Sequence, residues 1–416
     1  MLVTFVSYVN LDTFFDKQKN DASAWAQYST PETIVAKEMR RLATDNDFVV
    51  TALYSDSPTV RFLAGNITNR QTWTVTDRLP LVRDATRGVV LFFDERLISA
   101  YREAQRLYPN AQFQELHAPG GGNGIVLWEV ALSREDLRAA QGVDARYYAS
   151  NTVEGNPVKQ EALSQVGVDW TKSQPLAEPF TAELQSTLVI QDYGEYRFEV
   201  RGDASAPLWI DEYPVKDARI TLARGAHTLR LQVRGGSKKV ALWWQRPMID
   251  HSDPVPLTNL FRSPVTNNGL LGAYYRSPDA SGAPAFTQVD PELNYYFHVI
   301  PFPRPYSVVW TGKLYAPTTG EYKFALMSID DSRLQLDGQE LLKNPSGQTT
   351  EESMQLNRGW HDITVNFYDM TGATRIYLYW TPPDSKTQEL VPTRYLLPPM
   401  GDYPGDLQSF GAEGHK

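Results

Sequence analysis

The stretch Gly320-Glu-Tyr-Lys-Phe324 repeats an earlier stretch, Gly194-Glu-Tyr-Arg-Phe198, and this repetition decides how the chain is divided. Further landmarks recur in the same order: Gly142-Val-Asp-Ala-Arg-Tyr-Tyr148 as Gly269-Leu-Leu-Gly-Ala-Tyr-Tyr275, Arg224-Gly-Ala-His227 as Arg358-Gly-Trp-His361, and Trp244-Gln-Arg-Pro247 as Trp380-Thr-Pro-Pro383. Their spacing drifts from about 126 to about 136 residues, too long for a solenoid with units of roughly 20 to 50 residues. The pattern predicts two copies of one whole domain, preceded by a domain of another kind.

Length and composition agree with this division. A chain of 416 residues has room for about three domains, and 42% hydrophobic residues suffice for packed cores. The net charge of −9 argues against a nucleic-acid partner, for which a basic face is expected. The absence of cysteine excludes thiol nucleophiles, thiolate metal sites and disulfides. The 10 Trp and 22 Tyr are typical of sheet-rich domains and also of sugar-binding surfaces.

Residues 1–136 are predicted to form a small α/β domain. Thr30-Pro31-Glu32 has the hydroxyl, proline and acid of a helix start, with Thr30 as the N-cap. Phe48–Ala52, Val89–Phe93 and Ile125–Trp128 are β-rich runs, and Ser133-Arg-Glu-Asp136 opens a short final helix. Strands that alternate with helices favour a mostly parallel sheet.

No motif in this first domain predicts catalysis. The glycines of Pro119-Gly-Gly-Gly-Asn-Gly124 precede a strand, whereas a phosphate-binding loop follows one, so a plain loop is expected. His117 is interpreted as a surface or packing residue. The apolar run Leu2–Val9 is too short to cross a membrane and is interpreted as a strand or as the end of a longer segment.

A family resemblance covers about 130 residues of this region. It is carried by Asn10-Leu-Asp-Thr-Phe-Phe15, Trp25, Thr30-Pro-Glu-Thr33, Thr59-Val-Arg-Phe62 and Leu107-Tyr-Pro-Asn110. Together they resemble the extramembrane tail of bacterial family-39 glycosyltransferases, the protein-mannosyltransferase-like enzymes. The resemblance implies that Leu2–Val9 ends a last membrane helix. It also implies that the catalytic acids lie in the membrane half, so this chain itself would be non-catalytic.

Residues 142–264 and 269–400 are predicted to be antiparallel β-sandwich or barrel domains, followed by a tail at 401–416. The expected strands of the second copy are Val308–Leu314, Glu321–Leu326, Leu334–Leu336, Ile363–Phe367 and Arg375–Trp380. The ordered landmarks of the second copy resemble those of the PA14 domain family. The first copy keeps fewer of them and resembles the same family more weakly.

Ser328-Ile-Asp-Asp-Ser332 is the candidate metal site. Adjacent carboxylates place two hard oxygen ligands side by side, which suits Ca²⁺. The resemblance to calcium-dependent PA14 lectins of the yeast adhesin type implies that Asp330 and Asp331, joined by a cis peptide, bind Ca²⁺ and that the ion holds sugar hydroxyls. It implies Asp369 as a further ligand. The alternative is a turn and capping element that binds no metal.

The first copy serves as an internal control for this prediction. Its counterpart loop, Gly202-Asp-Ala-Ser205, has a single acid, Asp203, near Arg201 and Arg234, so any Ca²⁺ site is expected in the second copy only. His227 and His361 occupy equivalent positions and are interpreted as satisfied structural residues rather than ligands.

The function that the two resemblances imply is recognition of a glycan or a glycosylation acceptor. The chain would be a non-catalytic, extracytoplasmic part of a membrane glycosyltransferase that uses a lipid-linked sugar, and its partner would be the membrane-embedded half of that enzyme. A stand-alone cell-surface PA14 lectin or adhesin and an accessory region of a glycoside hydrolase are the alternatives. A glycosidase active site would need two positioned carboxylates in one cleft, and no such pair is identified.

Overall fold

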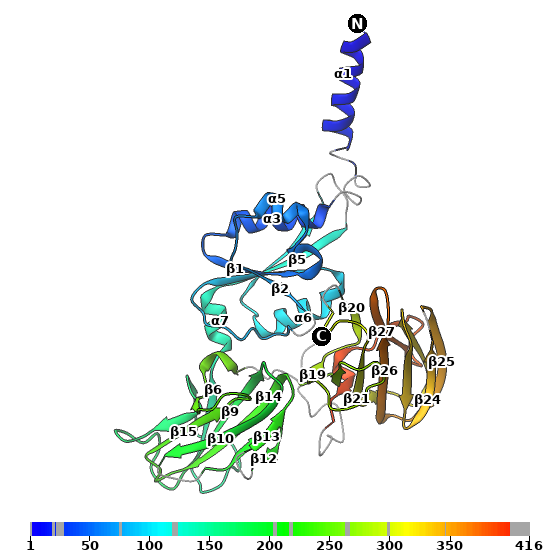
Figure 1. The fold of residues 1–416 in the computed structure, drawn as a ribbon. Coiled ribbons are helices and arrows are strands. Elements are labelled where there is room, and N and C mark those ends of the chain that lie inside the picture. The colour runs from blue at the N-terminus through cyan, green and yellow to red at the C-terminus, as the bar shows by residue number, and fades with distance from the viewer. Residues whose placement is uncertain are drawn as a thin grey trace. The chain divides into compact units, whose positions relative to one another are not determined.

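The computed structural model describes residues 2–18, 21, 29–74, 77–118, 124–202, 206–215, 219–262, 267–297, 300–345 and 347–399 (Figure 1). Trp25, Asp203 and most of the glycine-rich loop 119–124 therefore lie outside the described residues. The chain divides into two compact units, one of residues 1–79 with 84–139 and one of residues 80–83 with 140–416.

The first unit contains a five-stranded sheet in the order β2-β1-β3-β5-β4. Its strands are β1 (Asn46–Thr51), β2 (Arg70–Trp73), β3 (Gly88–Phe93), β4 (Gln112–His117) and β5 (Ile125–Leu132). β1 pairs in parallel with β2 and β3, whereas β3–β5 and β4–β5 are antiparallel. β3 is buried along its whole length, as a central strand must be when it is covered on both faces. The α/β architecture agrees with the sequence prediction, but the sheet is mixed rather than mostly parallel.

Helices accompany this sheet. They are α3 (Thr30–Leu42), α4 (Ala52–Ser55), α5 (Pro58–Ala64), the short 3₁₀ helix Glu95–Leu97, α6 (Ile98–Leu107) and α7 (Arg134–Ala140). Thr30 is the first helical residue of α3, so the predicted N-cap is displaced by one position to Ser29. The predicted start of α7 is confirmed, because Ser133 and Asp136 each accept a backbone N–H of the other.

The N-terminal apolar run forms a helix, α1 (Leu2–Asp12), which continues into the π-helical turn Thr13–Lys17. The strand interpretation of Leu2–Val9 is therefore wrong. No helix within the described ranges has the length and apolarity needed to span a membrane.

The second unit begins with a β-domain made of two antiparallel sheets. Its strands are β6 (Val143–Tyr148), β7 (Lys159–Leu163), β8 (Gly167–Asp169), β9 (Thr181–Ile190), β10 (Gly194–Gly202), β11 (Leu208–Ile210), β12 (Tyr213–Pro214), β13 (Arg219–Leu222), β14 (Gly225–Arg234), β15 (Lys239–Gln245), β16 (Asp253–Pro254) and β17 (Leu260–Phe261). One sheet has the order β12-β11-β14-β9-β6-β7, with β17 on β9, and the other has the order β13-β10-β15-β16, with β8 on β15.

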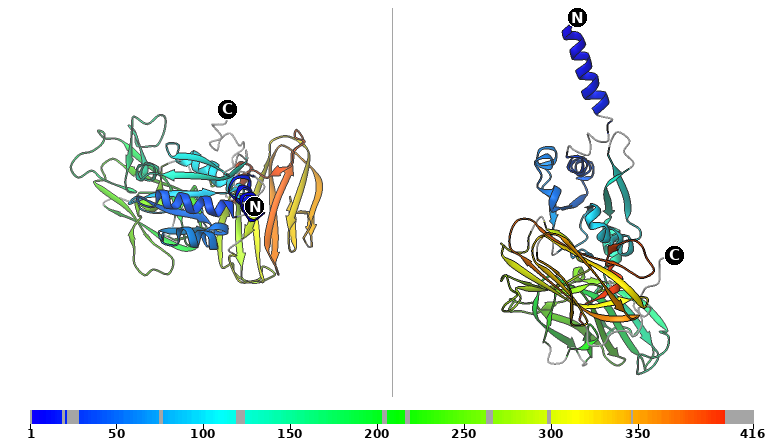
Figure 2. Two further views of the ribbon diagram at one scale, coloured as in Figure 1. Left: turned by 90° about the horizontal axis from the view of Figure 1, so that it is seen from above. Right: turned by 90° about the vertical axis from the view of Figure 1, so that its right-hand side faces the viewer.

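A second β-domain follows. Its strands are β18 (Leu270–Tyr275), β19 (Phe286–Asp290), β20 (Asn294–Phe297), β21 (Tyr306–Ala316), β22 (Gly320–Ser328), β23 (Ser332–Leu336), β24 (Gln339–Asn344), β25 (Thr349–Leu356), β26 (Gly359–Asp369), β27 (Thr374–Thr381), β28 (Glu389–Leu390) and β29 (Leu396–Leu397). The sheets have the orders β24-β23-β26-β21-β18-β19, with β29 on β21, and β25-β22-β27-β28, with β20 on β27. Each strand thus matches the strand twelve places earlier, so the two β-domains share one topology. Figure 2 shows the second β-domain in yellow to red from two further directions.

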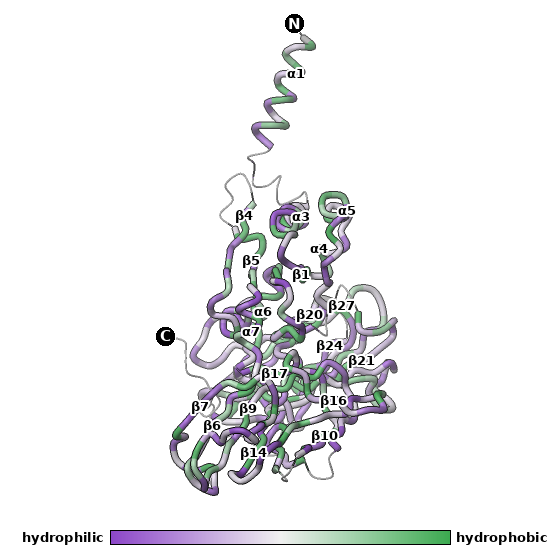
Figure 3. Tube along the Cα trace, turned by 90° about the vertical axis from the view of Figure 1, so that its left-hand side faces the viewer, coloured by the Kyte–Doolittle hydropathy of each residue, from purple (hydrophilic) through white to green (hydrophobic). Residues whose placement is uncertain are grey.

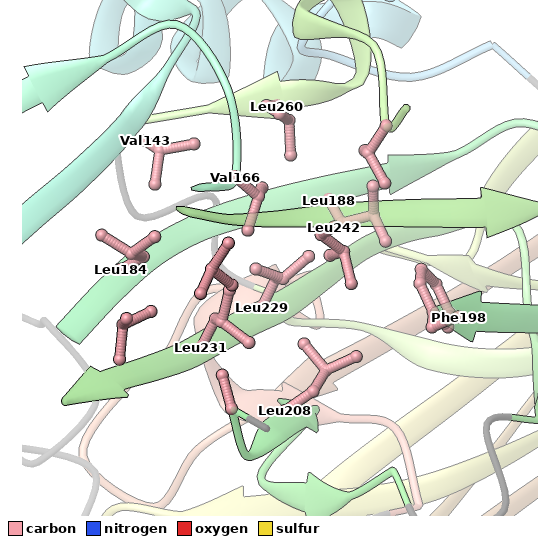
Figure 4. Close-up of a cluster of buried hydrophobic side chains, with 14 of the residues drawn as sticks. Val143, Val166, Leu184, Leu188, Phe198, Leu208, Leu229, Leu231, Leu242 and Leu260 are labelled. Carbon is pink, nitrogen blue, oxygen red and sulfur yellow. The ribbon is translucent and has the colours of Figure 1, made fainter. Parts of the chain in front are cut away.

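Each β-domain has its own hydrophobic core. The first is built from residues between Val143 and Leu260, several of which are labelled in Figure 4. The second is built from residues between Leu270 and Leu396, including the fully buried Trp310 and Trp380. Apolar and polar residues alternate along the strands (Figure 3), as expected when one face of each sheet meets the core and the other meets solvent.

The repeated sequence landmarks are structural in both β-domains. Gly194 lies against Pro247 and Gly320 against Pro383, so closely that an added Cβ would come within 2.8 Å and 2.6 Å of a proline side chain. His227 contacts the Asp211 carboxylate and the Ala223 carbonyl at 2.6 Å and 2.9 Å.

His361 repeats this arrangement with Asp337 and Asn357, each at 2.7 Å. The structural interpretation of both histidines is confirmed.

Candidate functional site

The predicted metal site lies where β22 ends and β23 begins, in the loop Ile329–Asp331. Ser328 and Ser332 flank the loop, are buried, and have their hydroxyl oxygens 2.7 Å apart. The backbone of the loop is tied to its neighbours, since Gly347 donates to the Ile329 carbonyl at 2.7 Å and Tyr368 donates to the Asp331 carbonyl at 2.9 Å. The two carboxylates are therefore presented from a fixed loop.

Asp330 joins two loops at this end of the domain. Its Oδ2 accepts the backbone N–H groups of Met370 and Thr371, at 2.9 Å and 3.0 Å, in the turn between β26 and β27. A carboxylate that accepts two backbone donors acts as a cap. Among the described residues the cis peptide bonds precede Pro179 and Pro305, so the bond between Asp330 and Asp331 is trans, unlike the bond that the lectin resemblance implies.

Asp331 has an unused acceptor. Its Oδ2 lies 3.4 Å from Arg333 Nη2, whereas its Oδ1 is buried and has no hydrogen-bond partner. A second unpaired acceptor belongs to Asn344, which pairs with Ser332 in the β23–β24 ladder. Asn344 is only 1% exposed; its Nδ2 donates to Leu326 and Gln348 carbonyls, and its Oδ1 is unpaired. Unpaired buried acceptors are rare in folded proteins and call for a donor.

Asp369 is placed differently from the other two acids. It is fully buried, its Oδ1 lies 2.8 Å from Arg304 Nε, and its Oδ2 accepts the hydroxyl of Thr374. Arg304 Nη2 also donates to Thr374 Oγ1 at 2.5 Å, which closes a three-residue network. Burial, and then the Asp369 carboxylate, raise the pKa of the neighbouring Tyr306 hydroxyl. Asp369 thus already has a cationic partner inside the domain.

The three acids consequently do not fit one calcium site as the structure places them. Within the described residues, no group of three or more His, Cys, Asp or Glu side chains is gathered closely enough to hold a metal ion. The positive charge that a dication would supply to Asp369 is supplied by Arg304. Calcium binding through Asp330 and Asp331 stays a prediction, and Asp369 is better described as half of a buried ion pair.

One signal in the sequence could have shown the orientation of Asp369. In β26, Ile363, Val365 and Phe367 are buried, and Asp369 continues the same alternation, so its side chain points into the sandwich. Arg304 and Asn344 were missed entirely. Arg304 is 65 residues from its partner, and no local pattern marks such a pair.

The first β-domain lacks the acid at this position. When the β9–β14 ladder is aligned with the β21–β26 ladder, Phe180 takes the position of Tyr306 and Gly235 takes that of Asp369. An added Cβ at Gly235 would come within 2.8 Å of the Phe180 ring. The counterpart of Arg304 is Glu178, which is exposed. The buried ion pair is therefore a feature of the second β-domain.

Comparison with known proteins gives two kinds of relative. The chain is 30% identical over 158 residues to the anti-sigma-I factor RsgI3 of Acetivibrio thermocellus, an alignment that covers 36% of this chain and 24% of that protein. The chain thus spans about a quarter of the length of this curated relative.

Solved structures give weaker likenesses. An anti-sigma factor domain-containing protein from Clostridium clariflavum is 20% identical, with 62% of this chain and 100% of that chain covered and a TM-score of 0.30. A PA14 sugar-binding domain from an RTX adhesin is 16% identical, with 32% and 99% covered and a TM-score of 0.28.

The predicted glycosyltransferase origin is wrong. The curated relative that the chain matches is named an anti-sigma factor and not a glycosyltransferase. The family-39 resemblance and the membrane-embedded enzyme half as a partner are not supported by these comparisons. The predicted PA14 resemblance of the second β-domain is confirmed. The PA14 domain family matches residues 266–394, so this part of the chain is a PA14 domain.

Proposed function

We propose that this chain is the glycan-recognising part of a regulatory protein related to anti-sigma factors, and that the PA14 domain carries the recognition. The 30% identity to an anti-sigma-I factor is the observation that carries the regulatory half of the proposal. The PA14 match at residues 266–394 supports the glycan half. Because β6–β17 have the same strand order as β18–β29, we propose that residues 142–264 are a second, divergent copy of the same domain.

Glycan contact at the Asp330–Asp331 loop is supported by the unpaired acceptors there. Asp331 Oδ1 and Asn344 Oδ1 are buried oxygens without donors, and a sugar ring presents hydroxyl donors at close spacing. A sugar hydroxyl that donates to one of these oxygens removes the cost of leaving that oxygen unpaired. Asp330 contributes by holding the β26–β27 turn beside them.

The region is proposed to act outside the cytoplasm, at a membrane surface. α1 exposes apolar side chains around its whole circumference, among them Val3, Phe5, Tyr8 and Leu11, which are 78%, 65%, 67% and 55% exposed. A helix that is apolar all round is normally buried in protein or lipid, whereas a helix that docks in a groove needs only one apolar face. Co-flotation of the full chain with phosphatidylglycerol vesicles tests this, and binding that survives Phe5→Asp/Leu11→Asp contradicts it.

The glycan proposal is tested by applying the purified full chain to an array of cell-wall oligosaccharides. We expect retention of at least one class of neutral oligosaccharide, weakened at least tenfold by Asp331→Ala. Asp384→Ala, which removes an exposed carboxylate from the β27–β28 loop, is the matched control and should leave binding unchanged. A wild-type chain that binds no oligosaccharide on the array contradicts the proposal.

A further inference from the structure

A shallow groove crosses the outer face of the larger sheet of the PA14 domain, away from the core. It encloses about 470 Å³, within the range of small-molecule sites. It is lined by Thr311 and Gly312 of β21, Gln335 of β23, Asp337 and Gly338 of the following turn, Asp362, Ile363 and Thr364 of β26, and Pro399.

Three polar side chains form a straight row along its floor. Thr311 pairs with Thr364 across the β21–β26 ladder, and Thr364 pairs with Gln335 across the β26–β23 ladder. Neighbouring strands are about 4.8 Å apart, so the row is about 10 Å long. None of the three side chains makes a hydrogen bond within the described structure, which leaves two hydroxyls and one amide available to a ligand.

The charged groups of the groove are already paired. Asp362 Oδ1 lies 2.7 Å from Lys313 Nζ, and both carboxylate oxygens of Asp337 are bonded, one to His361 and one to the Asp362 backbone N–H. An acidic ligand would therefore find no free cation among these lining residues. Their unpaired donors and acceptors suit a neutral, hydroxylated ligand.

The same row is closed in the first β-domain. There Gln185 pairs with Arg230 and Arg230 pairs with Trp209, in the positions of Thr311, Thr364 and Gln335. The Arg230 guanidinium lies 4.1 Å from the centre of the Trp209 ring.

Arg230 is also anchored by two acids, Glu212 at 2.8 Å and Glu183 at 3.7 Å. The counterpart of Glu212 is Gly338, so Thr364, Gln335 and Gly338 replace three of the residues that close the row, Arg230, Trp209 and Glu212.

We infer that this groove is a binding site for a neutral oligosaccharide, distinct from the Asp330–Asp331 loop and confined to the second β-domain. The inference rests on the proposed glycan recognition and adds a second subsite to it. The row is long enough for two linked sugar rings, with hydroxyls and an amide below them and Pro399 as an apolar edge.

The test introduces the residues that close the row in the first β-domain at the equivalent positions of the second β-domain. β-1,4-linked tetraoses of glucose, xylose, mannose and galactose are titrated calorimetrically into the full chain, into Thr364→Arg and into Gln335→Trp/Gly338→Glu/Thr364→Arg. Ser353→Arg makes a matched change on the exposed face of the other sheet. We expect at least tenfold weaker binding of one tetraose in both groove variants and no change in Ser353→Arg. Thermal unfolding verifies that the triple variant is folded, and Thr364→Arg alone, an exposed-face change, gives the result if it is not.

Two outcomes overturn the inference. If the wild type binds a tetraose, Asp331→Ala abolishes the binding and Thr364→Arg leaves it unchanged, the groove is not a site but the proposed glycan function stands. If the wild type binds none of the four tetraoses at millimolar concentration, the groove fails. The proposed function then fails as well only if the oligosaccharide array is also negative. The reverse change, Trp209→Gln/Glu212→Gly/Arg230→Thr, is expected to add a second binding equivalent.

Discussion

The two β-domains have one strand order and two different chemistries. Their inward-facing landmarks coincide: the Tyr196–Trp244 and Tyr322–Trp380 ring pairs have centroids 5.5 Å and 5.6 Å apart. The two domains differ at positions outside these landmarks. The second β-domain has the Arg304–Asp369 ion pair where the first has Glu178 and Gly235. It also has the open polar row where the first has the Arg230–Trp209 stack. The comparison teaches that the topology depends on the core residues, while recognition depends on side chains that the core leaves free to change.

The largest expected difference between the domains concerns the buried ion pair. Arg304→Ala leaves the fully buried Asp369 without its cation. Breaking a buried pair costs about 3–5 kcal/mol of folding free energy, and the lower end, about 3 kcal/mol, is expected because the Arg304 side chain is 23% exposed. Hydrogen exchange of the full chain, followed by mass spectrometry of peptides from β21 and β26, should show faster exchange in those strands.

The matched control is Glu178→Ala at the equivalent exposed position, expected to cost less than about 0.5 kcal/mol. Equal effects of the two substitutions would show that Arg304 is not a special feature of the second domain.

The second prediction concerns the aspartate–histidine pairs, which both domains share. Asp211→Ala removes the acceptor of His227 and of the Thr228 N–H and should destabilise the first domain by about 2 kcal/mol. Asp337→Ala should cost about 1 kcal/mol, because the Asp337 side chain is 44% exposed and that of Asp211 only 26%. Peptide-level exchange of β14 and β26 compares the two. A larger cost for Asp337→Ala would reverse the expected order.

Much of the β-architecture could be predicted from the sequence, because its strands are marked locally. Alternation in Ile363–Phe367 and the repeated turns gave the sandwich. By contrast, β2 (Arg70–Trp73) and β4 (Gln112–His117) were missed, since both are sheet edges with mostly polar residues. An edge strand shows no continuous apolar run, so its sequence resembles a loop.

The candidate site was predicted less completely than the fold. The Asp330–Asp331 loop was found because two adjacent acids are visible in the sequence. Asn344, which lies beside the loop, comes from β24, and Arg304, the partner of Asp369, comes from the segment before β21. Only the folded topology brings these residues there. The groove could not be predicted from the sequence either, because Thr364 and Gln335 are ordinary outward-facing strand residues. They become informative only when they are compared with their counterparts in the first β-domain, the stacked Arg230 and Trp209.

The third prediction is a pH dependence of the first β-domain. Both ring nitrogens of His227 face acceptors, Asp211 and the Ala223 carbonyl, which requires a doubly protonated ring. Burial lowers the pKa of His227, but the Asp211 carboxylate and the hydrogen bonds outweigh it and leave the pKa above the usual 6.5. The stabilisation is therefore complete below about pH 6.5 and is lost as the pH rises through the folded-state pKa.

Local exchange of β14 peptides at rising pH, corrected for intrinsic exchange rates, measures this effect. A whole-chain melt is unsuitable, because burial raises the pKa of Glu129 in the first unit to about 7, which gives a loss of stability of the same sign between about pH 4.5 and 7. His227→Gln should remove the dependence in β14. A stability of β14 that rises with pH in the wild type would refute the assignment of a protonated ring.

The smallest expected effect is that of calcium on the second β-domain. The sequence predicted a dication shared by Asp330, Asp331 and Asp369, whereas the structure pairs Asp369 with Arg304 and engages Asp330 with two backbone donors. A dication that uses Asp369 would have to displace Arg304. Without Asp369, the carboxylates of Asp330 and Asp331 remain, and that of Asp330 already caps the β26–β27 turn. A ligand present at a hundred times its Kd stabilises the folded state by about 2.7 kcal/mol, a shift readily seen in thermal unfolding. We therefore expect millimolar Ca²⁺ to leave the unfolding of the full chain unchanged. Heat of Ca²⁺ binding that disappears in Asp330→Ala/Asp331→Ala but not in Asp384→Ala would show that Asp330 and Asp331 bind the metal, and that the second β-domain differs from the first by a calcium site.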